Sequence, residues 1–425
     1  MEAEQDIIAV ANESVKQTSS NSQQSSDKIT KTLLEYLEIS ITEAEKKATP
    51  ALNIRDYFTV YLIETKVITQ GWSAKLANLG LVWRRYTEFE QLRSYLETIY
   101  PWTIVPPLPE KRATFTWENT PSDTFDPDFI DRRRAGLETF LHRVADHPIL
   151  CNDPLVASFL QQEDGWNEAI KETGYLQTAE SKLKALSVSI RLRNPDKQFE
   201  EVKANAVDLQ SNLSNVLDIR ARLASRRFNM YKMHGALGKV FSEWSAIEKD
   251  MGDGLQKAGH FFDSIAAGIG TALEDEELIA DHLKEYLFFA LSVQSVCERH
   301  EMLQLELEQA EDLVSSRISE KEKAQQGRSS LMSRLFGSVD TEEVRDIKVG
   351  QIDQKIQEGE ESVRELQLSL SEFSRNASKD IDLFNQKKVT DLKETFSIYV
   401  GMQIKMTRKV LQTWANIRDC IDSIP

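Results

Sequence analysis

At 425 residues, 40% of them hydrophobic, the chain is long enough for more than one domain with its own core, which excludes disorder throughout. Its 68 acidic and 52 basic residues give a formal net charge of -16 and argue against a protein that coats nucleic acid through its overall field. No apolar stretch approaches the ~18 residues of a membrane span and the N-terminus is acidic, so we expect a soluble cytosolic chain with peripheral membrane contacts.

Proline usage divides the chain into unlike parts. Nine of the eleven prolines lie between Pro50 and Pro154, and none interrupts residues 196–424. Because an interior proline costs a helix about 3 kcal/mol, the second stretch is suited to long helices. The polar, low-complexity N-terminus buries too little to offset the entropy of ordering. We therefore predict a disordered tail over residues 1–32, a compact mixed domain over 33–163, a linker over 164–194 and an all-α domain over 195–425.

The mixed domain begins with alternating or β-branched runs. Residues 33–41 and 57–67, and a third run starting at Gly80, predict three strands. Thr87 and Glu90 fit a capping box, so a helix should follow the third strand at once. Further along, we expect a loop at 101–112 with its Pro106 to Pro109 core in a polyproline conformation, then helices at about 127–146 and 153–163.

Three long helices are expected in the second domain. Pro195 suits a first helical position, and Gly268 and Gly270 followed by a capping box place one turn near residue 271. The segment 327–340 provides the second turn. The predicted helices are 195–270, 273–326 and 341–422. The first should be bent or locally broken by its glycines, Gly235, Gly238, Gly252, Gly254 and Gly259.

Apolar spacing along the third helix is typical of a coiled coil. Its apolar positions recur with a mean spacing of 3.5 residues, the period of a seam between supercoiled helices. They are Val363, Leu366, Leu370, Phe373, Ala377, Ile381 and Phe384. Such a hairpin exposes more apolar surface than two facing helices cover, so we predict a three-helix bundle that also dimerises.

Signatures of catalysis are missing from the sequence. There is no Gly-x-Ser-x-Gly elbow, His-Glu-x-x-His pair or Gly-x-x-x-x-Gly-Lys phosphate loop, so we expect neither an enzyme nor a cofactor. His147 and Cys151 are four residues apart, but two candidate ligands without a third are more typical of a core or loop than of a metal site. The three cysteines, Cys151, Cys297 and Cys420, are widely separated, which disfavours a disulfide framework and indicates a reducing compartment.

A stronger signal is Trp83-Arg84-Arg85-Tyr86, where the third strand ends and a helix begins. Arginines bind phosphate bidentately while a neighbouring aromatic ring packs on a sugar-like face. A solvated basic strand end is the alternative. Two more basic groups follow at similar intervals, at the end of the proline-rich loop and at Arg132-Arg133-Arg134 ahead of Leu137 and Phe140, and together they favour a ligand site.

With these motifs the mixed domain resembles a Phox homology (PX) domain, and the long-helix half resembles a BAR domain, the combination found in sorting nexins. The resemblance covers about residues 33–422. It implies an α+β PX domain with a three-stranded antiparallel sheet, helices and a proline-rich loop. An all-α BAR domain of three long coiled-coil helices, forming an elongated dimer, is implied to follow.

The resemblance also implies a ligand, phosphatidylinositol 3-phosphate. Arg85 would hold the 3-phosphate and Tyr86 would pack on the inositol ring. Lys111 would meet the 1-phosphate and Arg133 the ring hydroxyls. The neighbours of these residues, Arg84, Arg112 and Arg134, are assigned to the fold or to general surface charge.

Basic groups of the helical half are candidates for contact with anionic membrane. Residues 219–242 hold six basic residues and no acid; among them are Arg220, Arg222, Arg226 and Arg227. Lys387, Lys388 and Lys393 match the basic stretch that BAR-containing nexins place on their concave face, with a solvated helix face as the alternative for each. A near-surface cation contributes roughly 1 kcal/mol, so several are needed.

Two apolar segments could also touch lipid. Residues 180–193 resemble the amphipathic helix that joins the two domains in this family, although simple packing on the bundle is an equal alternative. The cluster at 331–336 is a membrane or partner contact, or the plug of a long hairpin.

The leading hypothesis is a non-enzymatic peripheral protein that binds phosphatidylinositol 3-phosphate on early or recycling endosomes. As a homodimer, or as a heterodimer with another PX-BAR nexin, it would sense or induce tubules for retrieval of transmembrane cargo. The resemblance adds a role in autophagy and a place at the preautophagosomal structure. A coiled-coil tether whose PX fold binds protein is the second hypothesis. The third, a lipid-modifying enzyme, lacks a recognisable nucleophile or metal site.

Overall fold

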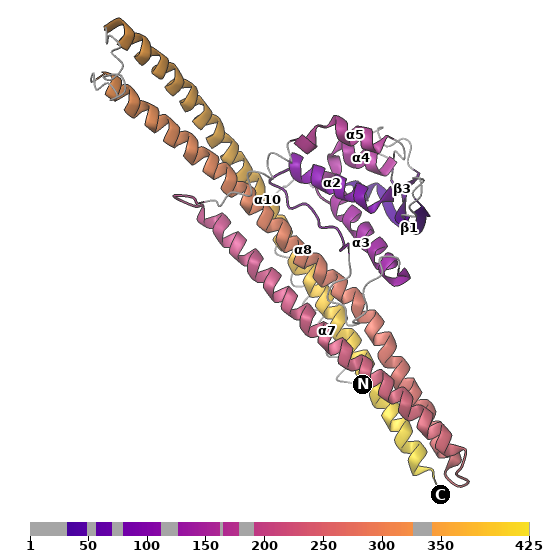
Figure 1. Cartoon of the computed structure of the whole chain (residues 1–425). Helices are drawn as coiled ribbons and strands as arrows, with labels where there is room; N and C mark the ends of the chain where they lie inside the picture. The colour runs from indigo at the N-terminus through magenta and orange to yellow at the C-terminus, as the bar shows by residue number, and fades with distance from the viewer. Residues whose placement is uncertain are drawn as a thin grey trace, which may run out of the picture.

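The computed structural model describes residues 32–48, 57–69, 80–111, 126–161, 165–177, 191–325 and 342–424. In this part of the chain a small mixed domain lies against the side of a long helical bundle (Figure 1). Most of the predicted tail, Arg112, the 331–336 cluster and nearly all of the 180–193 segment lie outside the described residues.

Three strands form an antiparallel sheet in the order β1 (Leu37–Ala48), β2 (Tyr57–Val67) and β3 (Leu81–Arg85). Ile41 of β1 lies opposite Ile63 of β2, and both are buried. The three predicted strands are therefore confirmed. The first begins later than expected, because residues 33–35 form a 3-10 turn, η1 (Leu33–Glu35), in which the Thr32 amide donates to Glu35 Oε1 at 3.3 Å.

Helices enclose the sheet from one side. They are α2 (Tyr86–Ile99), α3 (Pro127–Ala145), α4 (Pro154–Gln161) and α5 (Trp166–Glu172), with a short 3-10 turn, η3 (Leu150–Asn152), before α4. As predicted, α2 follows β3 at once. The expected capping pair was wrong by two residues, because Glu88 Oε2, not Glu90, accepts the capping bond, from the Arg85 amide at 2.6 Å. The helix therefore starts at Tyr86.

Three long helices make up the bundle: α7 (Lys197–Ser245), α8 (Gly252–Gln325) and α10 (Glu342–Asp422). Their number is as predicted, but the turn expected near residue 271 is at 246–251 instead. Gly268 and Gly270 lie inside α8, where buried Ile269 and Leu273 pack in the core. A helical glycine costs only about 1 kcal/mol, so this packing keeps the helix continuous.

The predicted first helix is interrupted at 246–251, directly before Gly252, which confirms a local break near one of its glycines. Two other glycines serve close packing. Gly238 of α7 faces Gly259 of α8, and a Cβ built on either would lie 3.0 Å from the carbonyl oxygen of the other. Because neither residue has a side chain, the two backbones approach each other directly. No local break occurs at Gly235 or Gly238, since α7 runs continuously through both.

The predicted seam on the third helix faces α8. Phe373, Ala377 and Ile381 of α10 are buried in one core with Leu283 and Val293 of α8. The mixed domain joins this same core through Ile104, which follows α2, while Trp102 packs against it from the edge.

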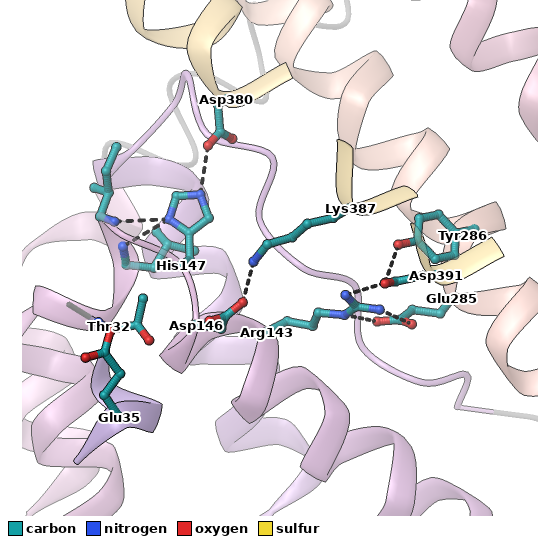
Figure 2. A network of polar contacts seen from close by, with 12 residues as sticks. Thr32, Glu35, Arg143, Asp146, His147, Glu285, Tyr286, Asp380, Lys387 and Asp391 are labelled. Carbon is teal, nitrogen blue, oxygen red and sulfur yellow. Dashed lines mark hydrogen bonds and ion pairs between the residues drawn. The ribbon is translucent and has the colours of Figure 1, made fainter. Parts of the chain in front are cut away.

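Polar contacts complete the junction between the two domains (Figure 2). Arg143 of α3 binds Glu285 of α8 through two contacts of 2.9 and 3.0 Å, and it also reaches Asp391 of α10 at 2.6 Å. His147 Nε2 lies 2.8 Å from Asp380 Oδ1. The mixed domain is therefore held on the bundle by charged groups around a small apolar centre.

Candidate functional site

Arg84 and Arg85 end strand β3 with opposite environments, as alternation along a strand requires. Arg84 is fully buried: its Nε and Nη2 donate to the Phe159 carbonyl oxygen at 3.1 and 3.0 Å, and its guanidinium lies 4.8 Å from the Phe159 ring centroid. This confirms the structural role predicted for Arg84. Arg134 is likewise structural, because its Nη1 donates to the Ile41 carbonyl oxygen at 2.6 Å.

Arg85 is exposed on the other face. Its guanidinium carbon lies 3.6 Å from the centroid of the Phe58 ring, a cation-π contact that holds the side chain in place. Within the described ranges no carboxylate pairs with this guanidinium. Its N–H groups are therefore suited to an anion that comes from outside the chain.

Tyr86, the first residue of α2, connects the end of β3 to the proline-rich loop. Its hydroxyl donates to the Pro109 carbonyl oxygen at 2.5 Å. Burial, with a further contribution from the Glu90 carboxylate, raises the pKa of Tyr86 to about 12. The phenol therefore stays protonated at physiological pH and keeps this hydrogen bond.

Arg133 enters the same region from α3. It is nine-tenths buried, its Nη2 donates to the Lys111 carbonyl oxygen at 2.6 Å, and its guanidinium lies 5.2 Å from the Tyr86 ring centroid. Its Nε has no hydrogen-bond partner among the residues that the structure describes. This Nε is enclosed by protein atoms. Burial raises the pKa of the neighbouring Tyr61 phenol, and its hydrogen bond with Arg133 partly offsets that rise.

Three of these side chains line one hollow in the surface. Arg85, Tyr86 and Arg133 line it together, with Tyr57, Phe58, Thr59 and Thr87. Lys111 is not in this lining; its Nζ lies 2.8 Å from Glu90 Oε1 and 5.7 Å from the Tyr86 ring centroid. Of the four residues predicted for the site, three meet in the hollow and the fourth is adjacent, paired with an acid.

Phe58 and Glu90 are parts of the site that sequence reasoning missed. Phe58 meets Arg85 only because β2 pairs with β3 in the register that places Val60 opposite Arg85. No motif in the sequence encodes that register. Glu90 could have been found, since it lies one helical turn after Tyr86 on the same face of α2.

Two of the four arginines proposed for membrane contact form internal ion pairs. Arg220 Nη2 lies 2.6 Å from Glu277 Oε1, and Arg227 pairs with Glu276. The sequence window held no acid, but α8 packs beside α7 and supplies both. Arg222 and Arg226 are exposed, and in the described part of the chain neither has an acidic partner.

The three lysines proposed for membrane contact also differ in whether they are paired or exposed. Lys387 pairs with Asp146 of the mixed domain (Figure 2). Lys388 donates to Asn385 Oδ1 at 2.8 Å, and burial lowers its pKa. Lys393 is exposed. Lys387 therefore serves the junction between the domains, and Lys393 is the most accessible of the set.

His147 has a structural role instead of a metal-binding one. Its Nδ1 accepts from the amides of Ile149 and Leu150 at 3.2 and 3.3 Å, opposite its contact with Asp380. The described residues contain no group of three or more histidines, cysteines or acids placed to hold a metal ion. None of the described helices is both long and apolar enough to span a membrane.

Comparison with known proteins identifies the family. A model described as PX domain matches residues 79–163, and one described as Vps5 C terminal like matches residues 173–419. Sorting nexin-4 of Bos taurus is 46% identical over 398 residues, which cover 92% of this chain and 88% of that protein. The chain belongs to the PX-BAR sorting nexins. Sorting nexin-4 of Homo sapiens has the same identity over 400 residues and the same coverage.

More distant relatives share the architecture. Sorting nexin-4 of Eremothecium gossypii is 24% identical over 90% of this chain and 97% of its own length. A solved structure described as the SNX-BAR Mvp1 tetramer superposes with a TM-score of 0.62 at 17% identity, covering 89% of this chain and 99% of that one. The predicted fold class is confirmed. The chain is a membrane-associated sorting nexin, from a family that is in general not enzymatic.

Proposed function

We propose that this sorting nexin binds phosphatidylinositol 3-phosphate on the cytosolic face of early or recycling endosomes, without enzymatic activity. The observation that carries the proposal is the hollow that the exposed Arg85 guanidinium and the Arg133 side chain line together with Tyr86. Two arginines around an aromatic ring match a phosphate on a polyhydroxylated ring.

Each side chain has a distinct part in this proposal. Arg85, already oriented by Phe58, binds the 3-phosphate bidentately, so little side-chain freedom is lost on binding. Tyr86 packs against the inositol ring and holds the loop through Pro109. Arg133 donates to ring hydroxyls. Lys111 exchanges its contact with Glu90 for the 1-phosphate.

Dimerisation is supported by an uncovered apolar stripe along α7. Its large side chains recur at heptad spacing and all are exposed in the single chain: Val216, Ile219, Leu223, Met230, Met233, Leu237, Val240 and Trp244. A contiguous exposed stripe of this kind marks an interface with another helix. Arg226 falls at one of its heptad positions. Arg222 and Lys393 are therefore the better candidates for membrane contact.

On this basis the protein acts as an elongated homodimer, or as a heterodimer with another PX-BAR nexin. It senses or induces tubules during retrieval of transmembrane cargo, and takes part in autophagy, including at the preautophagosomal structure. Two weak sites, the lipid pocket and the charged dimer, act together, since linked binding events raise avidity without new contacts.

Liposome sedimentation at physiological salt tests the lipid site. Wild type and Arg85→Ala are compared on anionic vesicles with and without phosphatidylinositol 3-phosphate. Loss of a bidentate charge-assisted contact should weaken lipid-dependent binding at least about 30-fold. Lys171→Ala, which removes one exposed positive charge of α5, is the control and should bind as wild type does. Binding indifferent to both the lipid and Arg85 would sink the proposal and favour the tether with a protein-binding PX fold.

A further inference from the structure

Two ion pairs join α8 to residues that lie directly beside the lipid site in sequence. Lys284 of α8 lies 2.7 Å from Glu110, the neighbour of Lys111. Glu277 of α8 lies 2.6 Å from Arg132, the neighbour of Arg133. The helical domain therefore binds both the proline-rich loop and helix α3, which carry parts of the proposed site.

The contact with the loop is buried. Lys284 is 4% exposed, and Asp281, at 3.7 Å, is its second acidic neighbour. Removing one partner of a buried pair leaves an uncompensated charge, which is strongly unfavourable. Glu110 is thus held at one position on α8, and the loop with it.

From its other side the same loop is held by the site itself. Tyr86 donates to the Pro109 carbonyl oxygen and Arg133 to that of Lys111. Gly136 of α3 packs so closely that an added Cβ would lie 2.7 Å from Pro109 Cβ. Loop residues 109–111 therefore lie between the site on one side and α8 on the other.

Glu277 extends this connection to the rest of the bundle. Its second oxygen lies 2.6 Å from Arg220 of α7, so one carboxylate links α3 to α7 through α8. Arg133 itself lines both the ligand hollow and a second hollow between the domains, which Glu110, Arg132 and Lys284 also line. A displacement of α3 or of the loop on α8 would reach Arg133 directly.

We propose that Glu277 and Lys284 of the BAR domain are positioning residues for the phosphoinositide site. They fix Arg133 and Lys111 in the geometry that binds the headgroup, so the site has its full affinity only when the PX domain is docked on α8. This inference rests on the proposed lipid binding. By linkage, headgroup binding in turn stabilises the docked arrangement.

Calorimetric titration of the full chain with soluble dibutanoyl phosphatidylinositol 3-phosphate tests this, because a soluble headgroup excludes effects of membrane curvature. Glu277→Gln removes a negative charge near an anion site, so the field alone would strengthen binding. A positioning role has the opposite sign, and we expect binding about 3- to 10-fold weaker. Lys284→Met should weaken binding similarly, and Lys284→Arg should restore it.

Asp146→Asn is the matched control. This variant makes the same acid-to-amide change at another ion pair between the domains, because Asp146 pairs with Lys387 of α10. That ion pair involves neither Arg132 nor the loop. It should leave headgroup affinity within twofold of wild type. Thermal unfolding monitors folding, and should Lys284→Met not fold, the partly exposed Glu277 carries the test alone.

The outcomes separate the two claims. Unchanged or tighter binding by Glu277→Gln, with wild type binding normally, overturns the positioning role and leaves the lipid site intact. An equal loss in Asp146→Asn overturns the specific positioning role of Glu277 and Lys284, since a general loss of docking on the bundle would then be the cause. Absence of binding by wild type removes the lipid site and this inference with it.

Discussion

Arg84 and Arg85 show how much one position along a strand decides. The two residues are adjacent and chemically identical, yet Arg84 is fully buried against Phe159 and Arg85 is exposed beside Phe58. The Arg-Arg-Tyr motif, taken together with the two basic groups that follow it, selected the end of β3 as a candidate site, and alternation along β3 explains which arginine faces outward. The cation-π partner of Arg85 depends on strand pairing, which the motif does not encode.

At Tyr86 we expect a pH-dependent effect. Its folded-state pKa of about 12 lies above the ordinary tyrosine value of 10.0, so between these two pH values the folded chain keeps a proton that the unfolded chain has lost. The associated stability is full below pH 10 and is lost as pH rises to about 12.

Tyr86→Phe should weaken headgroup binding about 3- to 10-fold at neutral pH through the lost bond to Pro109.

Denaturant unfolding at a series of pH values measures the same group. The free energy of unfolding of wild type should fall more steeply than that of Tyr86→Phe between pH 10 and 12. Parallel curves across that window would contradict the assignment of the raised pKa to Tyr86.

At the scale of elements, glycines had the least predictable role. The pattern Gly268-x-Gly270 predicted a helix end, but the buried face of α8 runs through it. The contact of Gly238 with Gly259 could also not be predicted from the sequence, because the two residues lie on different helices. Local rules describe what a glycine permits, and packing selects between an end and a close approach.

Gly259→Ala should therefore destabilise the helical domain. Its Cβ would lie 2.9 Å from Ser242 Oγ and 3.0 Å from the Gly238 carbonyl oxygen, and this crowding should cost about 2 kcal/mol. That exceeds the gain of about 1 kcal/mol in helix propensity. Gly235→Ala is the control, since nothing lies within 4 Å of its added Cβ, and it should raise the unfolding temperature. Equal stabilisation by both changes would disprove the close-approach account.

At the scale of the whole molecule, helix α7 leaves an apolar face uncovered. The apolar stripe on α7 faces solvent along much of the bundle, whereas the seam of α10 is covered by α8. A second chain is the natural partner for a surface with this spacing. The arm formed by α8 and α10 extends beyond α7 (Figure 1), in keeping with an elongated dimer.

Met233→Glu should break the proposed dimer. The residue is 67% exposed in the single chain, so a charge there is harmless to the monomer but unpaired in an interface. We expect the dissociation constant to rise by at least about 30-fold, the effect of losing an interface hot spot. Light scattering during size-exclusion chromatography measures the mass. Leu368→Glu, equally exposed on α10 but outside the stripe, should stay dimeric; a dimer that survives Met233→Glu would exclude α7 from the interface.

What the sequence determined by itself was local or periodic: three strands, the helix after β3, three long helices, a 3.5-residue seam and the basic motifs of the proposed lipid site. These depend on alternation, capping and spacing, which neighbours along the chain carry. Only the tertiary structure decided where the bundle turns and that Glu276 and Glu277 pair with the arginines of α7. It also decided that Lys387 pairs across the junction between the domains and that α8 forms ion pairs with Glu110 and Arg132. Each of these joins residues far apart in the chain, and their proximity follows from packing the whole molecule.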